Sequence, residues 1–475
     1  MFNVINDAWI KTDKGKYGIR ELLAKAPQLH EIIGENPINE YATLRFLSVF
    51  LMDAYQLKTI DDVVDLLERG EFDMKVIDAY VETCRREGVS FDIYDEKTPF
   101  LQEPRDAFDP KTPLSPIARL NRIYPVGTSK RFFDKEYAST ITMEDDQIAR
   151  YLTSITLHRF EGNSYGNCIS EGKMYAIIKG ENLFETLVMM IVPIDNAKRK
   201  YGLPYWRAGS IAGKAGKKNP ILEPGLLYGM TLPIRRVNVL DNATVLYVGN
   251  VNYSDPLWRD PHVPYANDKV MNPKEEFYRP WGNLLSLVDP DPDNGEVLKT
   301  VCLYSPVLKD MRRALHIVTY EGITSKSKYA DMRKNEFVLP AQYVGNDRQI
   351  GKIKALAEKV KDGDKYLGTS IKKTFTGTSR RPYPHAGAMK TYELAKYHEE
   401  ADRLFEERLE NGDFDQLSWI EDLKRICIKI FDKMIDSKLD AATMVKAIKQ
   451  RDIMIASFNK NIMKLQKSAN TKKED

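Results

Sequence analysis

The residues that most suggest chemistry lie in the segment Glu161–Gly172, which reads E-G-N-S-Y-G-N-C-I-S-E-G. Its first part, Gly162-Asn163-Ser164-Tyr165-Gly166, fits the G-x-S-x-G pattern that presents a nucleophilic serine in hydrolases. The same residues fit a glycine- and asparagine-rich loop whose backbone N–H groups come close to a ligand. A plain connecting loop is a third interpretation, because Gly and Asn are common at turn positions.

The elements expected on either side of this segment argue against a nucleophilic serine. Apolar residues spaced three to five apart predict a helix over Met143–Phe160, and Met174–Ile178 has the composition of a strand. A nucleophile elbow needs the opposite order, with a strand before the serine and a helix after it. His316 and His385 follow in the chain, but neither lies in a recognisable triad motif. A serine hydrolase that uses Ser164 is therefore the less favoured alternative.

Composition excludes several classes of protein. The chain has 475 residues, 43% of them hydrophobic, which suggests two or three domains with packed cores. Its net charge of +3 excludes a polycation, and its four cysteines form no C-x-x-C pair, which argues against a zinc site or a disulfide framework. Neither a signal peptide nor an apolar run long enough to span a bilayer is visible. These features predict a cytoplasmic protein without a cofactor.

The hydrophobic pattern divides the chain into two parts and predicts an α+β fold. Residues 1–345 mix helices, strands and loops, as expected for a large, irregular α/β domain. Residues 346–475 show only helical periodicity and predict a C-terminal four-helix bundle with a disordered tail after Lys467. The main predicted elements are a strand over Met1–Ile10, helices over Asn39–Tyr55, Ile60–Arg69, Glu71–Glu87, Gln349–Val360 and Met389–Leu409, and strands over Phe91–Tyr94, Thr231–Leu240 and Ala243–Val251.

Positive charge is concentrated near the start of the predicted bundle. The segment Asp347–Arg381 holds ten Lys and Arg residues against four Asp and Glu residues. Two basic pairs bracket a stretch, residues 374–379, that we interpret as a flexible, hydroxyl-rich loop between two helices; the pairs are Lys372, Lys373, Arg380 and Arg381. Cationic heads, small donors and one aromatic ring suit contacts with nucleic-acid phosphates. A solvated connecting loop is the alternative.

The sequence shows no catalytic or metal-binding constellation. It contains no H-E-x-x-H motif, no dinucleotide-binding glycine fingerprint and no close His/Asp cluster with metal spacing. Asp260 and His262 flank Pro261, and an isolated D-P-H is typical of a turn. A binding module is therefore favoured over an enzyme.

Several segments together resemble one family. They are Phe2–Ile10, Phe91–Gln102, the helix–loop–strand at 152–179, Gly180–Leu187 and Arg279–Leu287. In their order and spacing the chain is similar to CasA, the large subunit of the type I-E CRISPR surveillance complex, Cascade. The resemblance covers most of the chain, from residue 2 to the C-terminal helices. It implies a non-enzymatic subunit that recognises the protospacer-adjacent motif (PAM) in double-stranded DNA, helps to open the duplex, guides the displaced strand and recruits a helicase-nuclease.

The resemblance also implies roles for particular residues. A glycine loop that reads the PAM from the minor groove would map to Gly162, Asn163 and Ser164, and a lysine that reaches the same groove would map to Lys269, with Lys274 as a rival. The wedge that opens the duplex would map to Thr324, Ser325 and Lys326, where Lys326 stands in place of the family's usual glutamine. Docking on the complex near the 5′ end of the guide RNA would use Lys130, Arg131, Phe132 and Phe133.

On this interpretation, Lys372, Lys373, Arg380 and Arg381 hold phosphates of the duplex or of the displaced strand. The expected partners are the other Cascade subunits with their guide RNA, target DNA and the helicase-nuclease. A scaffold protein of some other assembly is the remaining alternative.

Overall fold

The computed structural model describes most of the chain, in several stretches. They are residues 1–121, 141–157, 174–197, 200–209, 225–233, 235–248, 260–263, 265–266, 269–270, 299–325, 328–377, 385–435 and 439–474. These residues form two compact units. The first extends to Val338 apart from a few short segments, and the second comprises Leu339 onward with Met311–Ala314.

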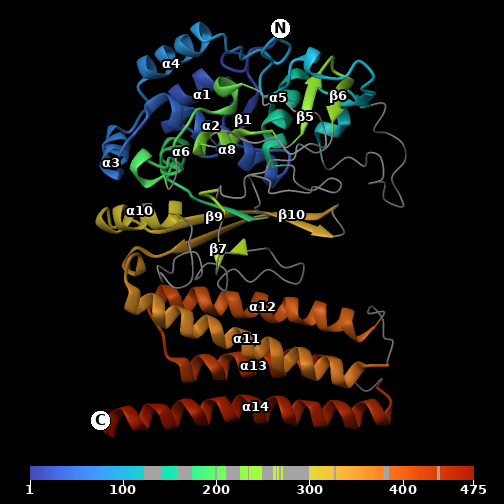
Figure 1. The fold of residues 1–475 in the computed structure, drawn as a ribbon. Coiled ribbons are helices and arrows are strands. Elements are labelled where there is room, and N and C mark those ends of the chain that lie inside the picture. The colour runs from blue at the N-terminus through green and yellow to red at the C-terminus, as the bar shows by residue number, and fades with distance from the viewer. Residues whose placement is uncertain are drawn as a thin grey trace. The chain divides into compact units, whose positions relative to one another are not determined.

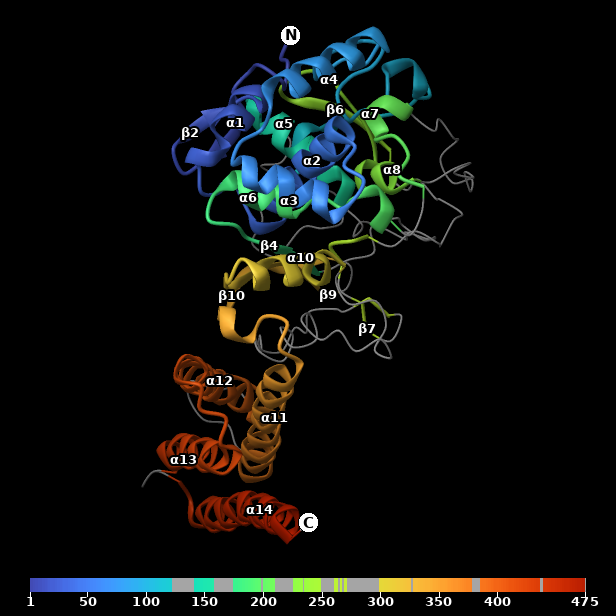
Figure 2. The same cartoon turned by 90° about the vertical axis from the view of Figure 1, so that its left-hand side faces the viewer.

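Helix α2 (Pro37–Tyr55) is the central element of the first unit, and its sequence explains both its start and its burial. The side chain of Asn36 caps the helix by accepting the N–H of Asn39 at 2.9 Å, and Pro37 occupies the first helical turn. Nearly every residue from Ile38 to Asp53 is buried, because other elements cover the helix on all sides. It contacts α4, α5, α6, α8 and β9 (Figures 1 and 2).

The remaining helices of the first unit pack on α2 or on its neighbours, and α10 packs on β4 and β9. Helix α3 begins with a capping box at Thr59 and ends at Gly70, which has the left-handed backbone that glycine favours. The helices are α1 (Ile19–Lys25), α3 (Ile60–Arg69), α4 (Met74–Arg86), α5 (Asp145–Ser154), α6 (Leu183–Met189), α7 (Tyr205–Ala208), α8 (Leu226–Thr231) and α10 (Lys299–Asp310).

The strands described in the first unit form small sheets rather than one large one. A three-stranded sheet has the order β10-β9-β4, with β4 (Met174–Ile178), β9 (Leu315–Ser325) and β10 (Lys328–Leu339). A second has the order β3-β6-β5, with β3 (Leu114–Pro116), β5 (Arg236–Val239) and β6 (Thr244–Val248). Two short antiparallel pairs complete the set: β1 (Ile10–Thr12) with β2 (Gly15–Tyr17), and β7 (Tyr265–Ala266) with β8 (Lys269–Val270).

The second unit is the predicted four-helix bundle. Helix α11 (Asp347–Phe375) packs against α12 (Ala386–Asn411), α13 (Gln416–Met434) and α14 (Ala441–Glu474) (Figure 1). Trp419 is fully buried and donates its indole N–H to the backbone oxygen of Leu356 at 2.9 Å. Gly363 allows α12 to approach closely, because a Cβ there would lie 2.0 Å from the Tyr397 hydroxyl.

Several sequence-based predictions of local structure are wrong. The strand over Met1–Ile10 is absent up to residue 9. The Asp7 carboxylate accepts the N–H of Asn3, and the Asp7 N–H donates to the Asn3 carbonyl, so the chain turns there. Phe91–Tyr94 contributes only a single bridge, between Asn3 and Asp92. Helix α14 is assigned through Glu474, and the predicted disorder of the tail after Lys467 stays a prediction. Strands β9 and β10 were not expected at all.

Candidate nucleic-acid interface

Helix α2 holds the segments on both sides of the predicted glycine loop. Residues 162–164 themselves lie outside the described residues. Before them, the Asn39 amide donates to the backbone oxygen of Arg150 at 3.1 Å and to the hydroxyl of Ser154 at 2.8 Å, both in α5. After them, β4 begins at Met174 and is buried throughout. The observed order of helix then strand is the reverse of a nucleophile elbow, as the sequence predicts.

Tyr41 of α2 packs against one tyrosine from each of two paired strands. Its ring centroid lies 4.4 Å from that of Tyr175 in β4 and 5.4 Å from that of Tyr320 in β9. Tyr175 and Tyr320 are register partners in the antiparallel β4–β9 pair. Aromatic contacts at these distances favour particular ring orientations. Tyr41 therefore orients both strands with respect to α2.

The D-P-H segment is a turn, as predicted, and it is buried against α2. The Asp260 carboxylate accepts the N–H of His262 at 2.9 Å and forms an ion pair with Arg45, whose side chain is 1% exposed. The Tyr41 hydroxyl lies 2.9 Å from Nδ1 of His262, and the His262 carbonyl accepts the N–H of Ala176 at 2.8 Å. The turn is thus fixed to both α2 and β4.

Protonation in this buried network follows from burial and charge. Burial lowers the pKa of His262 to about 4, so that the ring is neutral at neutral pH. Burial opposes the charge of Arg45, but the attraction of Asp260 outweighs it and raises the pKa of the guanidinium. The strands β7 and β8 follow the turn, and Lys269 pairs with Ala266 across them. The predicted PAM-reading lysine therefore follows a firmly anchored segment.

Strands β9 and β10 are tied to α2 by a charged cluster. The Glu40 carboxylate accepts from the Tyr320 hydroxyl at 2.8 Å and lies 2.8 Å from the Lys334 ammonium of β10. Lys334 also lies 3.4 Å from Glu31, and Glu336 of β10 lies 2.9 Å from Lys179.

Glu40 and Lys334 are partly buried, with side chains 12% and 23% exposed. Burial raises the pKa of Glu40, although the hydrogen bond from Lys334 opposes this shift. Burial disfavours the Lys334 charge, but the hydrogen bond and attraction of Glu40 together with Glu31 and Glu336 raise its pKa. These contacts favour the charged form of Lys334, which links β10 to Glu40 of α2.

The predicted wedge lies at the junction between the end of β9 and the start of β10. Thr324 and Ser325 are the last residues of β9, and Lys326 lies outside the described residues. Strand β9 continues through Ser325, and β10 begins at Lys328. The assignment of the wedge stays a prediction.

The basic region of the bundle differs from its prediction. Lys372 and Lys373 lie in the last turn of α11, not in a loop. Thr374 and Phe375 are fully buried, because they continue the apolar face of that helix, so Phe375 is unavailable for stacking on a base. Four exposed lysines form what we call the α11 cationic end: Lys361, Lys365, Lys372 and Lys373. Within the described part of the chain, none of these four forms an ion pair.

The other predicted contact residues cannot be placed. Arg380, Arg381, Lys130, Arg131, Phe132 and Phe133 all lie outside the described residues. Their roles stay predictions.

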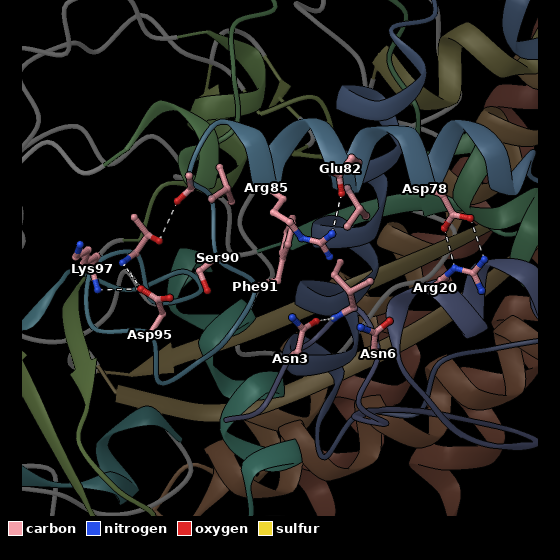
Figure 3. Close-up of a pocket in the computed structure, with 15 residues that line it drawn as sticks. Asn3, Asn6, Arg20, Asp78, Glu82, Arg85, Ser90, Phe91, Asp95 and Lys97 are labelled. Carbon is pink, nitrogen blue, oxygen red and sulfur yellow. Dashed lines mark hydrogen bonds and ion pairs between the residues drawn. The ribbon is translucent and has the colours of Figure 1, made fainter.

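A cavity of about 660 Å³ opens elsewhere in the first unit, beside α1 and α4 (Figure 3). Two of its arginines pair with carboxylates in the lining: Arg20 donates to both oxygens of Asp78 at 2.7 and 2.9 Å, and Arg85 donates to Glu82 at 2.7 Å (Figure 3). No lining residue belongs to α2. The cavity is therefore separate from the segments described above, and these two arginines are already neutralised.

The described residues contain no group of three or more His, Cys, Asp or Glu side chains placed to hold a metal ion. They also contain no helix that is both long and apolar enough to cross a membrane.

Sequence reasoning missed the residues that hold these segments together. We call Asn39, Glu40, Tyr41 and Arg45 the α2 anchor. One signal was visible, since Arg45 interrupts an otherwise apolar stretch of a predicted helix. A buried arginine requires a partner. The identity of that partner, Asp260, depends on the fold.

Comparison with known proteins agrees with the resemblance found in the sequence. The profile of the family described as CRISPR-associated protein Cse1 matches residues 3–430. Comparison with curated protein sequences gives no significant match.

Solved structures with the same fold cover nearly the whole chain. CasA (Cse1) of Thermus thermophilus matches with a TM-score of 0.77 and 19% identity over 98% of this chain and 99% of that one. Cse1 of Thermobifida fusca matches with a TM-score of 0.75 and 17% identity, over 97% and 98%. A chain described as part of a CRISPR RNA-guided surveillance complex gives 0.74 and 14%, over 95% and 99%. Because the family profile spans most of the sequence, this chain belongs to the Cse1 family of CRISPR-associated proteins.

Proposed function

We propose that the protein is the large subunit of a type I-E RNA-guided CRISPR complex, Cascade, and that it reads the PAM of double-stranded DNA from the minor groove. Family membership supports the assignment to the complex. The PAM-reading role is supported by one observation in particular. The stems of all three predicted DNA-contacting segments meet at the α2 anchor.

This convergence matters because base readout needs several donors at fixed relative positions. The minor groove presents mainly acceptors, purine N3 and pyrimidine O2, so backbone N–H groups near Gly162 and the ammonium of Lys269 have suitable chemistry. A groove with mostly acceptors distinguishes sequences poorly. We therefore expect tolerance of several PAM sequences.

The remaining roles divide between the two units. The end of β9 and the start of β10, with Thr324, Ser325 and Lys326, would separate the base pair next to the PAM. The α11 cationic end, with Arg380 and Arg381, would hold phosphates of the duplex or of the displaced strand. Lys130, Arg131, Phe132 and Phe133 would dock the subunit near the guide RNA.

The subunit itself would carry out no catalytic step and need no cofactor. It would act in the cytoplasm and recruit a helicase-nuclease, which would degrade the opened DNA. Specific labelling of Ser164 by a serine-reactive probe would contradict this part of the proposal.

The test is DNA binding by the reconstituted complex, measured with PAM-containing and PAM-free duplexes. Gly162→Val and Lys269→Ala are each expected to reduce the ratio of the two affinities by about tenfold or more, the order expected when a hydrogen bond from a charged group is removed or a close approach is blocked. Lys274→Ala tests the rival assignment, and it should leave the ratio unchanged if Lys269 is the lysine that reads the PAM. If neither Gly162→Val nor Lys269→Ala changes the ratio, these residues do not read the PAM.

A further inference from the structure

The α2 anchor contacts several separate stretches of the chain. Asn39 reaches α5, Glu40 reaches β9 and β10, Tyr41 reaches β4 and β9, and Arg45 reaches Asp260. All four anchor residues lie within two turns of one rigid, buried helix. A shift of α2 would therefore displace all of these stretches together.

The contact of Glu40 with Lys334 differs from the rest of the anchor. Asn39, Tyr41 and Arg45 are buried, as expected for groups that stabilise a core. Glu40 and Lys334 are only partly buried, and their opposite charges lie 2.8 Å apart. A charge-assisted contact of this kind is stronger than a neutral one and has a preferred geometry. Lys334 is also surrounded by Glu31 and Glu336, so its position is determined from several sides.

Two aromatic contacts strengthen this link. The Tyr320 hydroxyl donates to Glu40, and the Lys334 ammonium lies 6.0 Å from the centroid of the Tyr320 ring. Tyr320 in turn packs on Tyr41. Strand β9 is therefore held to α2 by the same group of side chains that holds β10.

We infer that Glu40 and Lys334 are positioning residues for PAM recognition: they set the placement of the β9 and β10 strands relative to the segments that α2 also anchors. The inference rests on the proposed function. In this role the pair touches no DNA. It would keep the ends of β9 and β10 at a fixed place relative to the glycine segment and to Lys269, so that one bound duplex can contact all three.

The experiment uses the reconstituted complex with Lys334→Met, Lys334→Arg and Glu40→Gln, each tested with PAM-containing and PAM-free duplexes. Lys334→Met should reduce the affinity ratio by about tenfold, in proportion to one charge-assisted contact. Affinity for PAM-free duplex should stay unchanged, because every contact with phosphate remains in place. Lys334→Arg, which keeps the charge, should retain most of the ratio, and Glu40→Gln should lie between them.

Hydrogen exchange of the same variants, measured without DNA, gives a second readout. Lys334→Met should speed exchange in β9 and β10 while amides of α3 and α4 stay as in the wild type. The matched control is Arg20→Met, which removes an ion pair from the same unit, and it should change neither β9 nor the affinity ratio. A general rise in exchange, with an equal fall in both affinities, would show a purely structural role and overturn the inference.

The outcomes separate this inference from the proposed function. If the wild-type complex does not discriminate PAM-containing duplex, the proposed function fails. If it does discriminate, and Lys334→Met retains both the ratio and the slow exchange of β9 and β10, the positioning role is wrong.

Discussion

The α2 anchor and the α11 cationic end carry charge in opposite ways. In the anchor, Arg45 and Glu40 are buried or nearly so, and each meets a counter-charge from a distant part of the chain. In the cationic end, Lys361, Lys365 and Lys372 stand exposed along one helix. A buried ion pair fixes the relative positions of its two side chains, at a cost in desolvation. Exposed lysines attract anions but do not fix where the anion binds. On the proposed function, the first region serves selectivity and the second serves affinity.

The largest expected effect comes from breaking the buried pair of the anchor. Arg45→Met leaves the Asp260 carboxylate buried without a counter-charge, so we expect the free energy of unfolding of the first unit to fall by about 3–5 kcal/mol. Urea unfolding, followed by hydrogen exchange of α2 and β4 amides, measures this change. Arg45→Met combined with Asp260→Leu should recover part of the stability, because no unpaired charge remains. Equal instability of the single and double variants would mean that packing, not charge, dominates.

Neutralising the basic residues of the bundle tests the other region. With Lys372, Lys373, Arg380 and Arg381 changed to Gln, we expect affinity of the complex for every duplex to fall by about 10–100-fold. The salt dependence should weaken by about 0.9 in log–log slope for each phosphate that is no longer neutralised. Titrations at several salt concentrations measure both. The matched control is Lys446→Gln with Lys449→Gln on α14, which should have little effect. A changed PAM preference at unchanged affinity would reverse the roles assigned to the two regions.

A partly buried acid allows the stability of the bundle to be changed without touching its basic surface. Burial raises the pKa of Asp402 to about 6 from 3.8, so the folded state binds more protons than the unfolded state between these values. Its contribution to stability is present at low pH and is lost as the pH rises through about 6. Asp402→Asn should therefore stabilise the bundle by about 1–3 kcal/mol at pH 7–8 and by little near pH 4.

Hydrogen exchange of α11–α13 amides at two pH values measures the effect of Asp402→Asn. The neighbouring exposed Glu406, changed to Gln, serves as the control and should give a smaller effect. DNA binding should not change in either variant. An equal gain at both pH values would contradict the assigned titration.

The smallest effect is expected at the cavity beside α1 and α4. Arg20 and Asp78 are about half exposed, and such pairs contribute little to stability. Arg20→Gln should leave both the unfolding transition and DNA binding close to those of the wild type. A clear fall in DNA affinity would extend the charged surface to this cavity.

Local sequence signals predicted those elements that depend mainly on neighbouring residues. Helix α3 has the predicted bounds, Ile60–Arg69, because Thr59 and Gly70 mark its ends. Strand β4 also has its predicted bounds, since its residues are apolar throughout. The four helices of the bundle follow from their periodicity, although α11 and α12 extend further than predicted.

Long-range partners explain what was missed. Residues 315–339 contain Glu321, Lys334 and Glu336. These charged residues interrupt the alternation of apolar and polar residues from which a strand is predicted. In the fold, Lys334 and Glu336 meet counter-charges from other segments, and β9 gains β4 as a neighbour. Similarly, Thr374 and Phe375 resemble loop residues in sequence, yet both are buried within the bundle.

The amino-acid sequence alone determined the fold class, the four-helix bundle, the family and the helix–strand order around Ser164. These features depend on periodicity and local order, which can be recognised from residues close together in the chain. Only the tertiary structure decided that Asn39, Glu40, Tyr41 and Arg45 hold the stems of three predicted DNA-contacting segments. Their partners lie more than a hundred residues away along the chain. Such pairings arise from burial, which removes polar groups from water and so requires each to find a partner that periodicity does not reveal.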